Sequence, residues 1–274
     1  MQILGVLLTY NNLEYLKCSL KQALDFCDEV IIIEGGHLRS RPKRSEDGTC
    51  EYIKTLNHPK LVIKDFHFKG RNDIVQWKIR ETISKESPLW ESDNWVCQWD
   101  DDIAFYNDDL EKVKEVMKKT KKDMIRFNER MFVYNFRFNV YPNKASGYHF
   151  DRITKDCYYR PMWRMHYKND KPYKKYHYMK DVEYFHYPFV KLPNRIRVRM
   201  ECSYEKGNSN AFKRLDNFMK VKWEKDEDIF NYKDIIEEFT NTSGLNIYTG
   251  PHPEIMENHL WRNINDIREV AKSK

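Results

Sequence analysis

Short apolar runs alternate with amphipathic stretches along the first part of the chain, and this alternation limits what the chain can fold into. The run at 2–9, "QILGVLLT", is almost wholly apolar, and leucines then recur at helical spacing from Leu13 to Leu24. A second apolar run, "DEVIIIEGG", follows at 28–36. Continuous apolar runs are typical of strands covered on both faces, and strand, helix and strand in succession form the unit of a parallel sheet. The pattern therefore predicts a parallel α/β sheet.

The alternation continues through the first half of the sequence and then changes. A third strand is expected at 60–66, a helix at 72–83 and a fourth strand at 94–100, before a helix that begins near Asn107. Residues 124–190 are instead crowded with aromatic and basic side chains that alternate in places. This second pattern predicts antiparallel strands and long loops added to the sheet.

These patterns define the predicted fold class and its parts. The class is α/β, with a mixed, mainly parallel sheet flanked by helices. Residues 1–120 are expected to form one half of a single domain and residues 121–200 its second half. Helical patterns return from Arg195 onward, so residues 201–274 are expected to form a helical C-terminal extension.

Composition excludes several classes of protein. Of the 274 residues, 41% are hydrophobic and 15% aromatic, which is not the composition of a disordered chain. The 48 Lys and Arg residues against 42 Asp and Glu residues give a net charge of +6, which indicates mild affinity for anions. The six cysteines are widely spaced, so neither a zinc cluster nor a disulfide framework is expected, and reduced thiols indicate a cytoplasmic protein.

A membrane-spanning segment is not expected. The N-terminal apolar run has no basic flank and no small-residue cleavage site, and no stretch approaches the roughly 20 apolar residues that a span needs. A basic segment at 195–199, "RIRVR", would permit peripheral contact with a membrane surface. The sequence therefore predicts a cytoplasmic protein that could associate with membranes.

Three consecutive aspartates follow the fourth predicted strand, in "WVCQWDDDIAF". Open parallel sheets bind ligands at the carboxyl ends of their strands, where these aspartates would lie together with Glu34 and the turn "TYNN". If the strand continues, Asp100 and Asp102 point to one side and Asp101 to the other. Two adjacent carboxylates favour Mg²⁺ or Mn²⁺, ions that are commonly held together with substrate phosphates. A solvated acidic loop is the alternative interpretation.

Five short segments, "LLTYNN", "DEVIIIEGG", "SEDGT", "GRN" and "QWDDD", resemble in their order glycosyltransferase family 2, whose members have the glycosyltransferase-A fold. The resemblance implies that residues 1–120 bind a nucleotide sugar and residues 121–200 an acceptor. Glu34 stands where the family has an acid that contacts the nucleoside, although "EGG" departs from the usual Asp-Asp-Gly-Ser. The donor-binding residues that the resemblance implies are Thr9, Tyr10, Asn11, Glu34, Arg71, Asn72, Asp100 and Asp101.

The resemblance also implies a metal site. Asp100 and Asp102 match the family's Asp-x-Asp motif, which binds Mn²⁺ or Mg²⁺ together with the donor. His186, in "YFHYPFVK", would complete this site; a histidine that belongs to an aromatic cluster and binds no metal is the alternative. His252 and His259 are expected to be structural.

The reaction that the resemblance implies is an inverting transfer of a sugar from a UDP- or GDP-sugar to a hydroxyl group of a glycan, lipid or protein acceptor. A carboxylate must then deprotonate that hydroxyl group. Asp181 and Glu183, close to His186 in the sequence, are the first candidates for this base, and Asp156 and Asp170 are further candidates.

Three alternatives remain open. A nucleotidyltransferase could use the same carboxylates and metal, but the turn "TYNN" lacks the glycines that such an enzyme would have after its first strand. The basic and aromatic residues of 124–200 could bind RNA or single-stranded DNA. Carboxylates at the strand ends would repel phosphates, however, so a nucleic-acid partner is not expected. A catalytically silent glycosyltransferase-like domain is the third alternative.

Overall fold

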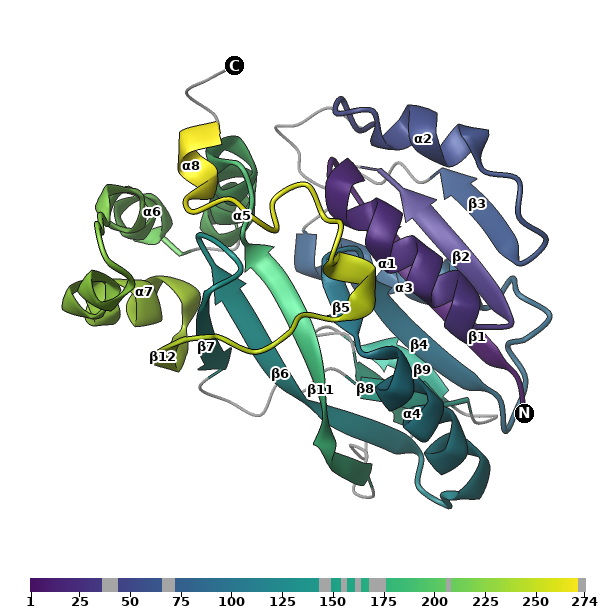
Figure 1. Ribbon diagram of the computed structural model, residues 1–274. Helices are drawn as coiled ribbons and strands as arrows, with labels where there is room; N and C mark the ends of the chain where they lie inside the picture. Colours follow the sequence, from purple (N-terminus) through teal and green to yellow (C-terminus); the bar gives the residue numbers. More distant parts are fainter. Residues whose placement is uncertain are drawn as a thin grey trace.

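The protein is built around a large mixed sheet, with helices on both faces of its N-terminal half (Figure 1). The computed structural model describes residues 1–35, 44–65, 72–142, 149–153, 157–160, 164–167, 176–205 and 208–270. Within this part the fold class predicted from the sequence, α/β with a mixed sheet flanked by helices, is confirmed.

The N-terminal half is a parallel sheet in the strand order β3-β2-β1-β4. Its strands are β1 (Ile3–Thr9), β2 (Glu29–Glu34), β3 (Leu61–Asp65) and β4 (Trp95–Asp100). The helices that alternate with them are α1 (Leu13–Phe26), α2 (Thr49–Thr55), α3 (Asn72–Ser84) and α4 (Asn107–Lys119). Thr9 is in register with Glu34, and Leu8 with Asp100, so the carboxyl ends of three strands lie side by side.

Both faces of this half are buried, as the continuous apolar runs predict. Along β1, Ile3 and Leu7 face a core formed with α1 and α4, whereas Leu4 and Val6 face a second core that includes residues of α3. A strand covered on both faces leaves its ends as the places where polar side chains can meet solvent or a ligand.

The second half of the sheet is mostly antiparallel. Its strands are β5 (Ile103–Phe105), β6 (Met124–Val133), β7 (Phe138–Pro142), β8 (His149–Arg152) and β11 (Tyr176–Phe189), and β9 (Cys157–Arg160) pairs with β10 (Arg164–Tyr167) as a separate small sheet. The prediction of antiparallel strands is wrong for β6 and β11. These two long strands run parallel, because the chain crosses over between them instead of turning back directly.

The C-terminal part is helical and also contributes a strand. It contains α5 (Pro193–Glu205), α6 (Ala211–Lys220), the 3₁₀ turn η1 (Asp226–Tyr232), α7 (Lys233–Thr240), β12 (Thr242–Ile247), the short turn η2 (Glu254–Met256) and α8 (Ile267–Val270). The strand β12 pairs with β7 at the edge of the main sheet, which the sequence patterns did not predict. The segment after β12 then crosses back toward α1 (Figure 1).

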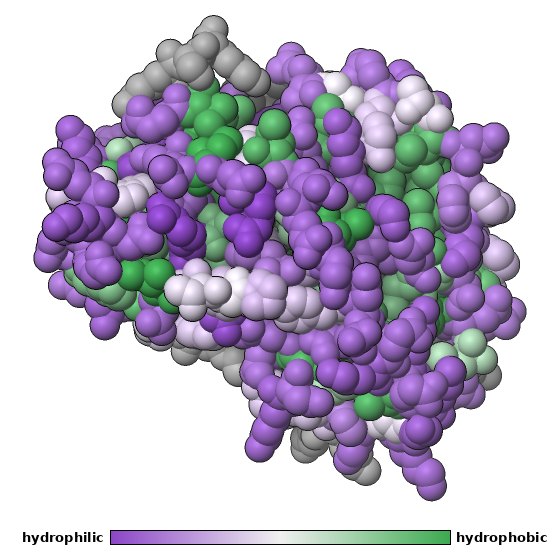
Figure 2. Space-filling model, viewed as in Figure 1, coloured by the Kyte–Doolittle hydropathy of each residue, from purple (hydrophilic) through white to green (hydrophobic). Residues whose placement is uncertain are grey.

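Hydrophilic residues cover most of the face seen in Figure 2, and the hydrophobic residues form scattered groups among them. No helix in the described ranges is long and apolar enough to cross a membrane.

The returning C-terminal segment buries two histidines in an aromatic core, as the expectation of a structural role implied. His252 accepts a hydrogen bond from the Tyr187 hydroxyl group at 2.8 Å through Nδ1 and donates from Nε2 to the Phe136 carbonyl at 2.8 Å. His259 stacks on Tyr15 with 4.3 Å between ring centroids. Burial lowers the pKa of each histidine to about 4.

We expect acid to destabilise this core through its two buried histidines. Below about pH 6.5 the two histidines bind protons in the unfolded state, whereas in the folded state their pKa of about 4 keeps them neutral. Each histidine should therefore reduce the free energy of unfolding by roughly 2 kcal/mol at pH 5 relative to pH 7. Urea denaturation across this pH range measures the loss. His259→Gln should reduce the pH dependence, whereas His58→Gln, at an exposed position, should not. If His259→Gln leaves the pH dependence of the free energy of unfolding unchanged, His259 is not a cause of the loss of stability in acid.

Candidate functional site

The main cavity of the protein has a volume of about 550 Å³ and opens at the carboxyl ends of β1 and β4. One wall comes from the N-terminal half: the end of β1 and the three consecutive aspartates. The opposite wall comes from the second half, and includes His186, Lys191 and residues of α5 and α7. The position at the strand ends is the one that the sequence predicted, and it brings together side chains far apart in the chain.

Asp101 ties the end of β4 to the end of β1. Its carboxylate accepts hydrogen bonds from the Thr9 hydroxyl group at 2.8 Å and from the Asn12 amide at 2.7 Å. Burial raises the pKa of Asp101 to about 7, and the neighbouring Asp102 adds to this effect, while Lys191 opposes it. The Asp101 carboxylate therefore holds the turn after β1 against the end of β4, next to Asp100 and Asp102.

Asp102 is the centre of a buried chain of charges. One carboxylate oxygen lies 2.6 Å from Lys191 Nζ and the other 3.3 Å from His186 Nε2. The other ring nitrogen of His186, Nδ1, lies 2.6 Å from Glu129 Oε1. Lys191 comes from the segment after β11, so this chain joins the two halves of the domain across the cavity.

The charges in this chain stabilise one another. Burial raises the pKa of Asp102, but Lys191 and His186 outweigh that effect and hold it well below its usual range. Burial likewise lowers the pKa of His186, but the carboxylates of Asp102 and Glu129 raise it to about 9. The raised pKa favours the protonated form of His186, between the carboxylates of Asp102 and Glu129.

Asp100 has a different partner. Its Oδ1 lies 2.9 Å from Nη2 of Arg80, whose side chain is only 1% exposed. The strand β4 ends at Asp100, and the two residues that follow form a turn before β5. The expectation that Asp100 and Asp102 point to one side of a continued strand is therefore wrong, because the backbone is no longer extended there.

The turn after β1 is held by a loop that begins at Ser45. The Asn11 backbone amide donates to the Ser45 hydroxyl group at 2.7 Å, and the Glu46 amide donates to the Asn11 side chain at 2.6 Å. Asn11 has a φ of 54°, a left-handed conformation that asparagine tolerates better than most residues. Tyr10 and Asn11 line the cavity beside this turn, so the structure places both of these predicted residues at the site.

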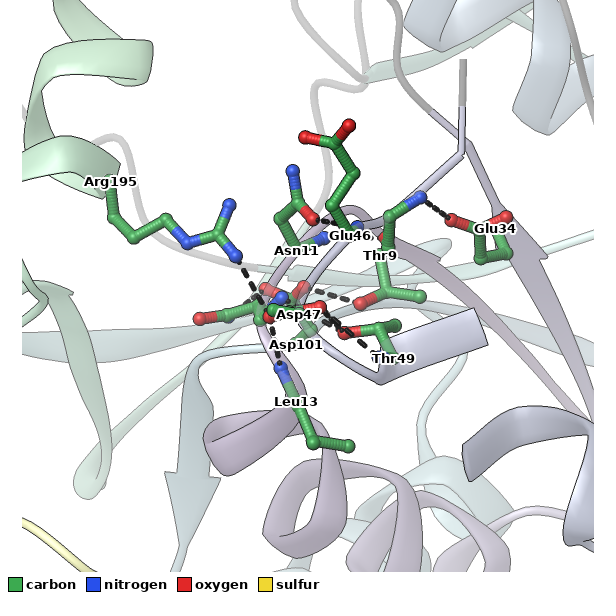
Figure 3. Close-up of polar contacts among 11 residues, drawn as sticks. Thr9, Asn11, Leu13, Glu34, Glu46, Asp47, Thr49, Asp101 and Arg195 are labelled. Carbon is green, nitrogen blue, oxygen red and sulfur yellow. Dashed lines mark hydrogen bonds and ion pairs between the residues drawn. The ribbon is translucent and has the colours of Figure 1, made fainter. Parts of the chain in front are cut away.

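Glu34 lies at the end of β2 and is 1% exposed. Its Oε1 accepts a hydrogen bond from the Ser45 backbone amide at 2.8 Å (Figure 3). Its Oε2 is buried and has no hydrogen-bond partner among the described residues. Because a buried carboxylate oxygen needs a donor, this atom is available to a ligand that reaches the end of β2.

The residues around Asp102 fit a divalent ion that is completed by a ligand. Among the described residues, no group of three or more His, Cys, Asp and Glu side chains converges as a preformed metal site. Mg²⁺ needs only one or two protein ligands when substrate phosphates supply the rest. Glu129 orients His186 so that Nε2 faces Asp102, which is how second carboxylates commonly hold metal-binding histidines. Asp102 and His186 have this arrangement, whereas Asp100, which lines the same cavity, pairs with Arg80; its role as a metal ligand stays a prediction.

The structure places the two predicted catalytic carboxylates outside the cavity. Glu183 of β11 lies 2.6 Å from Arg130 of the neighbouring strand β6, in an ion pair. Asp181 is exposed, at an irregularity where the pairing of β11 with β6 shifts register. Neither lines the cavity, so the interpretation of these residues as the base is corrected: the carboxylates of the described residues that line it are Asp100, Asp101 and Asp102.

Some predicted site residues lie outside the part of the chain that the structure describes: Arg71, Asp156 and Asp170. Most of the basic segment at 37–44 lies outside it as well. Asn72 is the first residue of α3.

Sequence reasoning missed most of the cations. Arg195 and Arg199 line the cavity with Lys191, although their segment was interpreted as a surface that could contact a membrane. Arg80, the partner of Asp100, was not singled out at all. The sequence signal for Lys191 was its place two residues after the end of β11, the strand that carries His186. Such a signal becomes informative only once the tertiary contact of Lys191 with Asp102 is known.

Comparisons with known proteins give a distant structural similarity. No protein-family model matches the chain, and no curated protein matches it. Residues 1–349 of S. aureus TarS in complex with UDP-GlcNAc superpose with a TM-score of 0.48 and 16% identity over 86% of this chain and 81% of that one. The same TarS fragment alone gives a TM-score of 0.47 at 16% identity, covering 86% and 80% of the two chains. Its UDP complex gives 0.46 at 15% identity, covering 88% and 71%. Similarity at this level does not identify a substrate.

Asp100→Asn should destabilise the fold, because it removes the counter-charge of the buried Arg80 guanidinium. We expect the free energy of unfolding to fall by roughly 2–3 kcal/mol, measured by urea denaturation at pH 7. Asp25→Asn is the matched control: Asp25 pairs with Lys21 on the surface of α1, and its loss should change stability by less than about 0.5 kcal/mol. Equal effects of the two substitutions would contradict a structural role for the Arg80–Asp100 pair.

Proposed function

We propose that the protein is a glycosyltransferase that uses a nucleoside-diphosphate sugar. The observation that carries this proposal is the cavity at the strand ends, where Asp102 of the N-terminal half faces His186, Lys191 and Arg195 of the second half. Acids of one half and bases of the other give a site that can take a diphosphate and a divalent ion together. The resemblance of the sequence segments to glycosyltransferase family 2 supports the same activity.

The cations would stabilise the leaving group. Negative charge develops on the diphosphate as the bond to the sugar breaks, and preorganised positive groups stabilise it most effectively in a site with little water. Lys191, Arg195 and Arg199 line the same wall of the cavity. Asp102 and His186 would hold Mn²⁺ or Mg²⁺, which supplies Lewis-acid stabilisation of the diphosphate when bound.

Glu34 would select the nucleoside. Its buried Oε2 can accept a hydrogen bond, and Gly35, the next residue, lines the cavity. Uracil and guanine each carry a ring N–H group that can donate to such an acceptor, which favours a UDP- or GDP-sugar as donor. The inverting course of the reaction remains part of the proposal.

The acceptor would contact the apolar part of the cavity lining, which is formed by Phe189, Val198, Met200 and Phe239. Such apolar groups pack against the faces of sugar rings or against alkyl groups. The proposed acceptor is a hydroxyl group of a glycan, lipid or protein, and no nucleic acid is required.

A ligand screen tests the donor site. We expect UDP or GDP, with Mn²⁺ or Mg²⁺, to raise the melting temperature, and CDP and ADP to have smaller effects, because a ligand of the folded state stabilises it by mass action. Glu34→Gln should reduce the preference among the bases, and Asp102→Asn should abolish the shift. Release of UDP or GDP from the matching nucleotide sugar then measures turnover. A well-folded protein that binds none of the four nucleotides would contradict the proposal.

The proposed metal site makes a separate prediction. If Asp102 and His186 hold the ion, EDTA should remove most of the nucleoside-diphosphate shift, and His186→Ala should make the remaining binding insensitive to EDTA. His58→Gln, which changes an exposed histidine, should leave the EDTA effect unchanged. Strong binding that is equally insensitive to EDTA in the unaltered protein would show that the cations of the cavity wall suffice without a metal ion.

A further inference from the structure

Arg195 occupies a special position between the two halves of the domain. It lies in the first turn of α5 and lines both the main cavity and a smaller cavity of about 170 Å³ next to it. Its Nη2 lies 2.8 Å from Oδ2 of Asp47, and Figure 3 shows the side chain reaching from α5 toward that carboxylate. The side chains of Arg195 and Asp47 are only 17% and 26% exposed, so the pair is partly shielded from water.

Asp47 is itself rigidly held. Its Oδ1 accepts hydrogen bonds from the backbone amide of Thr49 at 3.1 Å and from the Thr49 hydroxyl group at 2.6 Å. Its Oδ2 accepts a bond from the Leu13 amide at 3.1 Å. Gly48, between Asp47 and Thr49, has a φ of 89°, which only glycine adopts easily. Asp47 therefore joins the beginnings of α1 and α2, and offers α5 a fixed anion.

The ion pair leaves Arg195 suited to a second anion. A guanidinium group carries five N–H donors, so it can contact Asp47 and a phosphate oxygen at the same time. Burial lowers the pKa of Arg195, whereas Asp47, Tyr10 and Asp101 raise it, and the group remains a cation at neutral pH. A long side chain that is already ordered loses less entropy when it binds a ligand.

We propose that Asp47 is a positioning residue for the donor site: it holds Arg195 where the guanidinium group meets the diphosphate. This inference rests on the proposed function, and it extends that function to a residue that does not line the main cavity. It also gives a physical role to the Ser-Glu-Asp-Gly-Thr segment, whose Asp47 would link the nucleotide half to α5.

A double-mutant cycle tests this role. The variants are Asp47→Asn, Arg195→Ala and their combination, and the ligands are UDP with uridine and GDP with guanosine, measured by calorimetry. Each single substitution should weaken the diphosphate roughly tenfold or more and leave the nucleoside within about twofold. The double variant should bind no more than about threefold more weakly than Arg195→Ala, because Asp47 acts through Arg195.

Thr49→Val is the control, because it removes the hydrogen bonds of the Thr49 hydroxyl group with Asp47 and with the Asn12 amide but keeps both partners of the Asp47–Arg195 ion pair. It should retain diphosphate affinity within about threefold. Asp47→Ser, which keeps an oxygen near the helix starts, replaces Asp47→Asn if that variant does not fold.

Several outcomes would overturn the inference. Equal weakening of nucleoside and diphosphate, additive effects in the double variant, or a loss in Thr49→Val as large as in Asp47→Asn would each reduce Asp47 to a structural residue. If the unaltered protein binds the diphosphate and Asp47→Asn binds it equally well, the inference fails and the proposed function stands. If the unaltered protein binds neither diphosphate, both fail.

Discussion

A carboxylate that leaves water needs a partner, and this requirement organises the whole edge of the sheet. The parallel strands end side by side, so their acids would otherwise repel one another. Instead Asp100 pairs with Arg80, Asp101 is held by hydrogen bonds from Thr9 and Asn12, and Asp102 meets a lysine and a histidine. Each acid thereby fixes one contact between elements distant in sequence.

Some of these partners come from the second half of the chain, which explains how two differently built halves make one site. The parallel half supplies the acids and the turn after β1. The segment after β11 supplies Lys191 and Arg195, which reach Asp102 and Asp47 respectively. The apolar cores pack the two halves, and these ion pairs connect the first turn of α5 and the segment before it to the turns at the strand ends. A substitution that breaks one of these ion pairs in one half is therefore expected to displace its partner side chain on the other wall of the cavity.

The sequence predicted the first half well because its structure follows from local patterns. The apolar runs and helical spacings predicted strands β1 to β4 and the helices α1, α3 and α4. The resemblance to glycosyltransferase family 2 placed His186 in one site with Asp102, and their side chains lie 3.3 Å apart. Parallel pairing of β6 with β11 and the addition of β12 to the sheet depend on long-range contacts that no local pattern records. Asp181 and Glu183 were misjudged for a related reason. Closeness to His186 in sequence does not place them in the cavity: Glu183 pairs with Arg130, and Asp181 lies at a register shift of β11.

The charged side chains that line the cavity determine which ligand charges it can hold. Asp102 and Glu129 are paired with Lys191 and His186, and the two carboxylates raise the pKa of His186 to about 9. On the proposed function, Asp102 and His186 would hold a divalent ion, which would supply Lewis-acid stabilisation of the diphosphate. Lys191, which lies 2.6 Å from Asp102, would also contact the diphosphate, so that acids and cations of the cavity each have a partner of opposite charge in the proposed complex.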